Sequence, residues 1–234
     1  MKLLFSILLA LCWLPGPAQA ADELASGTTA DGMSVPYVLT AGSKPAYAVI
    51  LMPGGAGIMS PRLNPNGRVA FGMGGNFLIR SRALFGSGPF VAASTDATST
   101  PGRILAITAD LQRRYGPLKV YVVGTSRSTE ATMKLAEPLD GRVAGFVHTS
   151  PMNSISSFDP RRFRSRHLIV VHRLDACRVT RPSNGEASHR SYGTELIVMD
   201  GGKSTGEDCE AFAYHGYNGI EAETVEKIKA WIAR

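Results

Sequence analysis

Short apolar runs alternate with stretches of mixed polarity along most of the chain. Mostly apolar or β-branched runs predict strands over residues 37–40, 47–52, 89–93, 118–123, 143–149, 167–172 and 195–199. Stretches with apolar positions at helical spacing predict helices over residues 76–85, 103–114, 129–135 and 220–233. Residues 47–52 are almost continuously apolar, which is typical of a strand buried on both faces. The alternation predicts an α/β fold, a mostly parallel sheet flanked by helices on both faces.

Pro36 comes directly before the first of these strands. Proline has no N–H group to donate to a sheet ladder, so it is tolerated at the first residue of a strand or on an edge strand. Residues 37–40 are therefore predicted to form an edge strand.

The first twenty residues have a different pattern. Lys2 precedes an apolar run from Leu3 to Leu14, and the small residues Ala18 and Ala20 follow. This pattern predicts a cleavable secretory signal over residues 1–20, followed by a single domain over residues 21–234, and hence an exported protein, periplasmic or secreted. The apolar run is too short to span a bilayer and no later run approaches that length, so stable membrane insertion is not expected.

Removal of this segment changes two counts. Loss of Lys2 lowers the formal charge from +6 to +5, and loss of Cys12 leaves two cysteines of three. Two cysteines in an exported protein predict one disulfide, Cys177–Cys209, and two buried free thiols are the alternative. The net charge is positive, but the sequence has no run of basic residues interleaved with aromatic ones and no cysteine or histidine spacing typical of a zinc site. A nucleic-acid partner is therefore not predicted.

A tight strand-to-helix turn is predicted around Ser126. The apolar strand ends at Gly124-Thr125-Ser126, and helix-compatible sequence follows at once. Such a turn exposes the serine hydroxyl at its apex, and a side chain at position 124 would collide with the crossing helix. Ser128 stands where the G-x-S-x-G motif has a second glycine. The alternative interpretation is an ordinary connection between a strand and a helix.

A glycine-rich turn, Pro53-Gly54-Gly55-Ala56-Gly57, ends the strand over residues 47–52. Glycines let the backbone turn sharply and leave N–H groups facing outward, as an oxyanion hole requires. The alternative is that this turn is only a connection.

A serine nucleophile needs a histidine base and a carboxylate that orients the base. His215 lies in a loop between the last strand and the terminal helix, where it can reach the strand ends. The other histidines are interpreted as core or strand-end residues, or as solvated in the case of His189; they are His148, His167, His172 and His189.

Asp175 is the candidate acid because it follows a strand on the same carboxyl edge as the serine. Asp200, at the end of the next strand, and Asp159 are the alternatives. The order Ser, Asp, His favours Asp175, and the predicted disulfide would tie its loop to that of His215.

The chain resembles the α/β-hydrolase superfamily, and within it a group of small exported bacterial serine hydrolases. The resemblance runs from about residue 46 to the C-terminus, and its more specific motifs are residues 51–57, 76–82, 124–127, 171–177 and 209–217. It implies that Ser126 is the nucleophile, Asp175 the acid and His215 the base. It also implies oxyanion donors from the backbone of Arg127 and of the Gly55–Ala56 turn.

The predicted reaction is acyl transfer to water through an acyl-enzyme, which requires no metal or organic cofactor. The predicted function is hydrolysis of carboxylic esters of small acyl groups. Amidase, thioesterase and acyltransferase activities remain open, as do the oligomeric state and a non-catalytic binding role on a hydrolase scaffold.

The connection over residues 150–166 has 17 residues, which are too few for a lid, so no cap domain and short-chain acyl substrates are predicted. This connection carries Arg161, Arg162, Arg164 and Arg166. They are interpreted as a solvated basic turn, or alternatively as a surface that steers anionic substrates toward the site.

Overall fold

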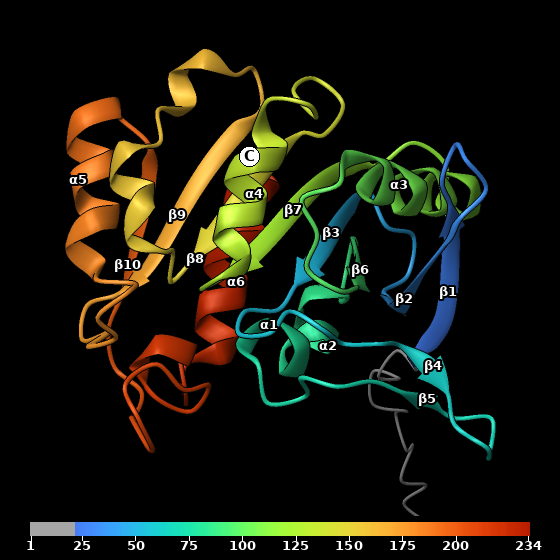
Figure 1. Cartoon of the computed structure of the whole chain (residues 1–234), viewed down its shortest axis with the longest axis horizontal. Helices are drawn as coiled ribbons and strands as arrows, with labels where there is room; N and C mark the ends of the chain where they lie inside the picture. Colours follow the sequence, from blue (N-terminus) through green and yellow to red (C-terminus); the bar gives the residue numbers. More distant parts are fainter. Residues whose placement is uncertain (1–21) are drawn as a thin grey trace, which may run out of the picture.

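An eight-stranded sheet forms the centre of the computed structural model, which describes residues 22–234 (Figure 1). The predicted signal over residues 1–20 therefore lies outside the described residues. The strand order is β1-β2-β6-β3-β7-β8-β9-β10. The bounds are β1 (Glu23–Thr28), β2 (Ser34–Ala41), β3 (Tyr47–Met52), β6 (Phe90–Ser94), β7 (Lys119–Thr125), β8 (Gly145–Thr149), β9 (Arg166–His172) and β10 (Glu195–Met199).

The strands from β6 to β10 in this order are parallel, whereas β1 and β2 are antiparallel additions at one side. A small separate ribbon pairs β4 (Arg62–Leu63) with β5 (Val69–Ala70). The mostly parallel sheet predicted from the sequence is confirmed.

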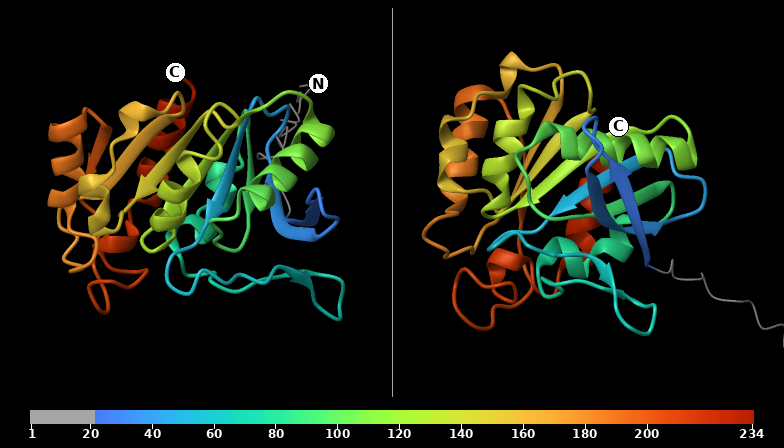
Figure 2. Two further views of the ribbon diagram at one scale, coloured as in Figure 1. Left: turned by 45° about the horizontal axis from the view of Figure 1, so that its top comes forward. Right: turned by 45° about the vertical axis from the view of Figure 1, so that its right-hand side comes forward.

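Helices cover both faces of the sheet (Figures 1 and 2). One face packs against α3 (Pro101–Tyr115), α4 (Ser128–Ala136) and α5 (Pro182–Tyr192). The other face packs against α1 (Phe77–Arg80), α2 (Arg82–Phe85) and α6 (Glu221–Ile232). None of the helices among the described residues is both long and apolar enough to cross a membrane.

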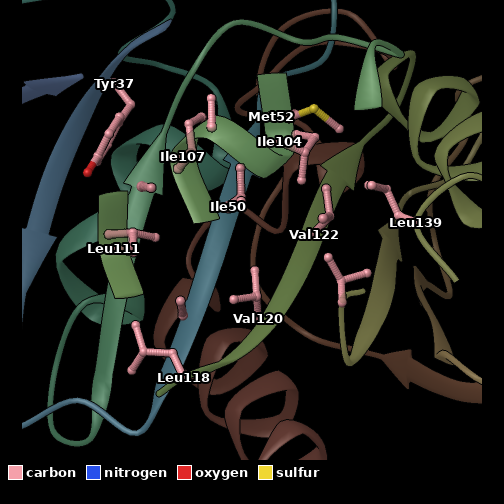
Figure 3. Packing of buried hydrophobic residues seen from close by; sticks show 14 of the residues in the cluster. Tyr37, Ile50, Met52, Ile104, Ile107, Leu111, Leu118, Val120, Val122 and Leu139 are labelled. Carbon is pink, nitrogen blue, oxygen red and sulfur yellow. The ribbon is translucent and has the colours of Figure 1, made fainter. Parts of the chain in front are cut away.

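The apolar core lies in two layers because alternate residues of each central strand point to opposite faces. Ile50 and Met52 of β3 pack with Ile104 and Ile107 of α3, as Figure 3 shows. The intervening Leu51 packs in the other layer, with the side chains of α1, α2 and α6. The prediction that residues 47–52 are buried on both faces is confirmed.

The prediction of an edge strand over residues 37–40 is wrong. β2 lies between β1 and β6, and β1 is the edge strand. Pro36 is tolerated because the ladder between β2 and β6 begins only at Val38, so no donor is needed on that side at residue 36. β1 was missed because its sequence, ELASGT, is only weakly apolar.

Three further elements differ from the sequence prediction. The predicted helix over residues 76–85 is divided into α1 and α2 at Ser81. The polar helix α5 was not predicted, and it packs on β9 through Gly185, where a Cβ atom would lie 2.9 Å from a methyl carbon of Val171. The β4–β5 ribbon was not predicted either.

Candidate active site

Ser126 lies at the apex of the turn between β7 and α4. Its φ angle is +52°, a left-handed conformation that is uncommon for residues other than glycine. Residues in such strained conformations cluster at functional sites. A Cβ atom on Gly124 would lie 2.9 Å from the carbonyl oxygen of Ser128, so the predicted need for glycine at position 124 is explained by the close helix crossing. The turn therefore has the geometry of a nucleophile elbow.

Ser128 takes the place of the second motif glycine without opening the turn. Its buried hydroxyl accepts a hydrogen bond from the N–H of Thr125 at 2.8 Å and donates one to the carbonyl of Met52 at 2.8 Å. These bonds connect the elbow to the end of β3, directly before the glycine-rich turn. A serine at this position therefore supplies a link that glycine could not make.

Asp175 and His215 form a buried hydrogen-bonded pair. The Nδ1 atom of His215 lies 3.0 Å from Oδ2 of Asp175, and both side chains are almost fully shielded from solvent. The Asp175 carboxylate also accepts the N–H of Cys177 at 2.9 Å. An acid held in this way orients the imidazole and leaves its Nε2 atom as the nitrogen that can take up a proton.

Thr180 contacts both residues of this pair, and it was not identified from the sequence. Its hydroxyl donates to Oδ2 of Asp175 at 3.1 Å and lies 3.1 Å from Nδ1 of His215. A threonine five residues after an aspartate carries no distinctive sequence signal, so only the folded loop identifies it.

Ser126 and His215 line one cavity of about 500 Å³. Its walls are largely apolar and come from segments distant in sequence, with side chains that include Met73, Phe77, Met152 and Val179. The segments over residues 54–76 and 200–216 both run along the sheet edge at which the site lies (Figure 2). The site therefore has an apolar chamber beside its serine.

The glycine-rich turn packs directly against the serine. A Cβ atom on Gly54 would lie 2.8 Å from the carbonyl oxygen of Thr125, so only glycine fits there. Gly55 and Arg127, two of the predicted oxyanion residues, line the cavity with Ser126, whereas Ala56 lines a neighbouring hollow that also contains Gly55 and Arg127.

Asp96 holds the far end of this turn. Its carboxylate accepts the N–H groups of Met59 at 2.6 Å and Ser60 at 2.9 Å. The N–H of Gly57 in turn donates to the carbonyl of Gly54 at 3.0 Å. The backbone beside the serine is therefore fixed by hydrogen bonds at both ends.

The loop that carries His215 is supported by three side chains that sequence reasoning missed. Ser150 donates to the carbonyl of His215 at 2.7 Å, and its N–H donates to the hydroxyl of buried Tyr217 at 2.9 Å. Arg80 donates to the carbonyl of Gly216 at 2.6 Å. Charge-assisted bonds of this kind restrict where the imidazole can lie.

A disulfide joins Cys177 to Cys209, as predicted from the cysteine count. It connects the loop of Asp175 to the segment that leads to His215. Asp175, Cys177 and His215 also place three potential metal-ligand atoms within 4.8 Å of one another. Because the Cys177 sulfur is bonded to Cys209 and His215 Nδ1 is hydrogen-bonded to Asp175, these atoms suit a hydrogen-bonded Asp–His pair better than a metal.

The remaining histidines lie as the sequence suggested. His148 in β8 and His167 in β9 are buried beside each other, and His172 is buried at the end of β9. His189 is exposed on α5. The alternative acids are elsewhere: Asp200 pairs with Arg173 at the surface, and Asp159 pairs with Arg161.

No family model matches the sequence, and a comparison with curated proteins gives no match. Solved structures are similar in fold. Est1E from Butyrivibrio proteoclasticus has a TM-score of 0.61 at 13% identity, over 92% of this chain and 98% of that chain. The esterase domain of a Rhodothermus marinus protein has a TM-score of 0.58 at 13% identity, over 90% and 97%. A serine hydrolase without lid from Xanthomonas campestris has a TM-score of 0.56 at 9% identity, over 88% and 94%. The chain has the α/β-hydrolase fold.

The α/β-hydrolase fold is minimal in this chain. The connection between β8 and β9 contains only two short 3₁₀ helices, Asn153–Ser157 and Pro160–Arg162, so no cap domain is inserted there. The basic residues of this connection lie near the start of β9, whereas the site is near the other end of that strand (Figure 1).

Most of these arginines are engaged locally. Arg161, Arg164 and Arg166 pair with Asp159, Asp140 and Glu195 respectively. Arg162 lies 5.3 Å from the ring centroid of Phe163. The basic turn is therefore a locally paired surface feature, and it does not line the cavity.

Proposed function

We propose that this protein is a serine hydrolase that uses Ser126, His215 and Asp175 and passes through an acyl-enzyme. Its proposed substrates are carboxylic esters with small or short acyl groups. One observation carries the proposal: the left-handed serine at the elbow lines the same cavity as an imidazole whose other nitrogen is hydrogen-bonded to a buried carboxylate.

The proposed reaction begins when the Ser126 hydroxyl attacks the ester carbonyl and His215 Nε2 takes its proton. The backbone N–H groups of Arg127 and of the Gly55–Ala56 turn stabilise the oxyanion. The protonated imidazole gives its proton to the leaving alcohol, and Asp175 stabilises the imidazolium. Water then attacks the acyl-enzyme with His215 as base, which releases the acid and regenerates the serine.

The proposal of small substrates rests on the size of the chamber. A cavity of about 500 Å³ without a cap domain offers no long enclosed tunnel for a fatty acyl chain. Its apolar walls favour a short alkyl or aryl group over a sugar or a peptide. We therefore expect turnover to fall as the acyl chain is lengthened beyond the short-chain esters.

The alternatives differ in their chemistry. An amidase, a thioesterase and an acyltransferase would use the same three side chains, so a substrate panel must distinguish them. A non-catalytic binding protein is less consistent with a strained serine beside an oriented imidazole, because strain of about 1–3 kcal/mol costs stability without benefit to binding.

Export from the cytoplasm is part of the proposal. The disulfide between Cys177 and Cys209 supports an oxidising compartment, such as the periplasm or the extracellular space. The predicted signal over residues 1–20 supplies the route. Detection of an N-terminus at Ala21 in the protein isolated from its source would test this part.

The proposed nucleophile is tested by covalent labelling. A fluorophosphonate should label the protein at Ser126, because an activated serine reacts where ordinary serines do not. The Ser126→Ala variant should lose the label, and Ser154→Ala, which changes an exposed serine, should keep it. Labelling that survives Ser126→Ala unchanged would refute the assignment.

A panel of ester, amide and thioester substrates completes this test. Acyl groups of increasing length should be compared on the labelled and unlabelled protein. Ester turnover that disappears with labelling and declines with chain length is the expected result, and a preference for long chains contradicts the short-chain proposal.

A further inference from the structure

A second hollow lies beside the catalytic cavity, and we call it the α4 hollow. It has a volume of about 240 Å³ and lies between the glycine-rich turn after β3, residues 97–99 and one face of α4. Gly55 and Arg127 line both the α4 hollow and the catalytic cavity. The two spaces therefore adjoin at Gly55 and Arg127, next to Ser126.

Three charged residues line the α4 hollow, and two of them are cations. Arg127, at the N-cap of α4, is followed at helical spacings by Glu130, Ala131 and Lys134, so these residues lie on one face. Arg127 and Lys134 are exposed, and neither forms an ion pair with any residue in the range 22–234. Two cations therefore face the hollow with their charges unpaired.

Glu130 is the one acidic residue among those that line the α4 hollow. Its carboxylate accepts a hydrogen bond from the hydroxyl of Ser154, and both residues also line the next groove along α4. Lys134 lines that groove too, but Glu130 is bonded to Ser154, outside the hollow, and forms no ion pair with Arg127 or Lys134. The charged side chains of the hollow sum to one positive charge.

Polar groups complete the opposite wall. Thr98 and Ser99 face the hollow, and the Thr98 oxygen already accepts the N–H of Thr100 at 3.0 Å, which leaves its O–H free to donate. The catalytic cavity, by contrast, is lined mainly by apolar side chains such as Met73 and Phe77. The two adjoining spaces therefore suit two different parts of one substrate.

We propose that the α4 hollow is a subsite for an anionic group of the substrate, held by the side chains of Arg127 and Lys134. This inference rests on the proposed hydrolase function and names its substrate class: esters with a short apolar part on one side of the ester bond and a carboxylate on a short linker on the other. The guanidinium presents paired N–H donors that match a carboxylate, and the lysine adds a second cation.

Matched ester pairs test this subsite. Monoethyl glutarate is compared with its carboxamide analogue, ethyl 4-carbamoylbutanoate, which places the carboxylate on the acyl side. The butyrate ester of glycolate is compared with the butyrate ester of glycolamide, which places the carboxylate on the alcohol side. Hydrolysis is followed by pH-stat at low salt, and kcat/KM is expected to be about fivefold or more higher for the carboxylate in one of the two pairs.

The Lys134→Gln variant should lower this carboxylate-to-carboxamide ratio about fivefold, and Lys134→Arg should restore most of it. Lys119→Gln makes the same change of charge at an exposed residue at the start of β7, on the far edge of the sheet. That control should leave the ratio unchanged, because the effect belongs to a contact and not to the net charge.

The outcomes separate the subsite from the hydrolase function. If the carboxamides are hydrolysed by a mechanism that needs Ser126 but neither pair favours the carboxylate, the subsite is wrong and the hydrolase stands. An equal loss of the ratio in Lys119→Gln also overturns the subsite, since it points to long-range attraction. If no ester is hydrolysed and Ser126 is not labelled, the proposed function itself fails.

Discussion

At the scale of single residues, Ser126 is central to the proposed function. Its left-handed φ angle is uncommon for a serine, yet a glycine there would remove the only hydroxyl at the apex. Gly124 and Gly54 make the conformation possible, because both allow backbone to approach more closely than a side chain would permit. The strain at this one residue thus positions the hydroxyl of the proposed nucleophile.

The proposed base and acid give a prediction at this scale. His215→Ala should lower kcat roughly 10⁶-fold and Asp175→Asn roughly 10⁴-fold, since residues of a triad act as a unit. The two losses should not add in the double variant. Steady-state kinetics on a short-chain ester checks this, and His189→Ala, which changes an exposed histidine on α5, is the control.

If His189→Ala were inactive while His215→Ala retained turnover, the assignment of the base would be wrong. Circular dichroism of each variant is needed as well, because Asp175 and His215 are buried and their loss also removes hydrogen bonds.

At the scale of elements, the site depends on connections that have little regular structure. The segment from Asp200 to Ala213 contains no helix or strand, and Cys209 and Ala211 in it line the cavity that also contains Ser126 and His215. The disulfide to Cys177 holds this segment directly. Arg80 holds the residues next to it, through hydrogen bonds to the carbonyls of Gly75 at 2.7 Å and Gly216 at 2.6 Å. Cross-links between loops thus replace the rigidity that helices would supply.

The disulfide gives a prediction at this scale. Peptide mapping without reduction should recover Cys177 and Cys209 in one linked peptide. The Cys177→Ser/Cys209→Ser double variant should unfold at a lower temperature, with a loss of roughly 3 kcal/mol in the free energy of unfolding. It should also lose turnover, because the disulfide holds residue 177, whose backbone N–H donates to the Asp175 carboxylate.

Two freely alkylated thiols in protein from an oxidising compartment would overturn the disulfide. Full activity in the double variant would show instead that the bond stabilises the fold without positioning the acid.

At the scale of the whole molecule, two buried histidines couple folding to pH. Thr132 donates its hydroxyl hydrogen to the carbonyl of Thr129, so it accepts from Nδ1 of His148 at 2.8 Å. His148 Nε2 then accepts from His167 Nδ1 at 3.2 Å, which leaves His167 Nε2 buried without a partner. Both rings are therefore neutral, and a proton on His167 Nε2 would have no acceptor.

Burial lowers the pKa of His167 from 6.5 to about 4 and lowers that of His148 well below 6.5. At a pH between the lowered pKa of the folded protein and 6.5, the unfolded chain binds protons that the folded protein does not. The free energy of unfolding therefore falls as the pH drops below 6.5. The expected slope is about 1.4 kcal/mol per pH unit for each histidine. Above pH 6.5 this contribution is fully present.

Urea unfolding at pH 7 and pH 5 measures this dependence. The difference between the two pH values should shrink in His167→Phe, which fits among Phe146, Phe158 and Phe163, whereas the exposed control His189→Gln should keep it. Hydrogen bonds from Ser165 and Arg161 lower the pKa values of Asp140 and Asp159 from 3.8 to about 2, so the stability that these carboxylates contribute is fully present between pH 5 and pH 7 and is lost only below pH 3.8. An unchanged pH difference in His167→Phe would contradict the assignment.

The sequence alone was sufficient for the strands from β3 to β10 in the main sheet, and it supplied the candidate residues of the elbow and of the proposed triad. These features depend on short-range patterns: apolar runs for buried strands, Gly124 and Ser126 at a strand-to-helix boundary, and Asp175 following a strand. The chain order Ser, Asp, His added a constraint that does not require coordinates. Local pattern is informative here because parallel strands bring their carboxyl ends to one edge.

Other features were decided only by the tertiary structure. β1 is a strand through its antiparallel pairing with β2 and its packing against α3, which lies too close to Gly27 for a Cβ atom to fit, and not because its sequence favours strands. Thr180, Ser150 and Arg80 have their roles through contacts with residues far away along the chain. The distance between the basic turn and the cavity, and the α4 hollow itself, likewise arise where separate connections meet. Such contacts carry no periodic signal, because they depend on how the elements pack and not on the residues next to them in sequence.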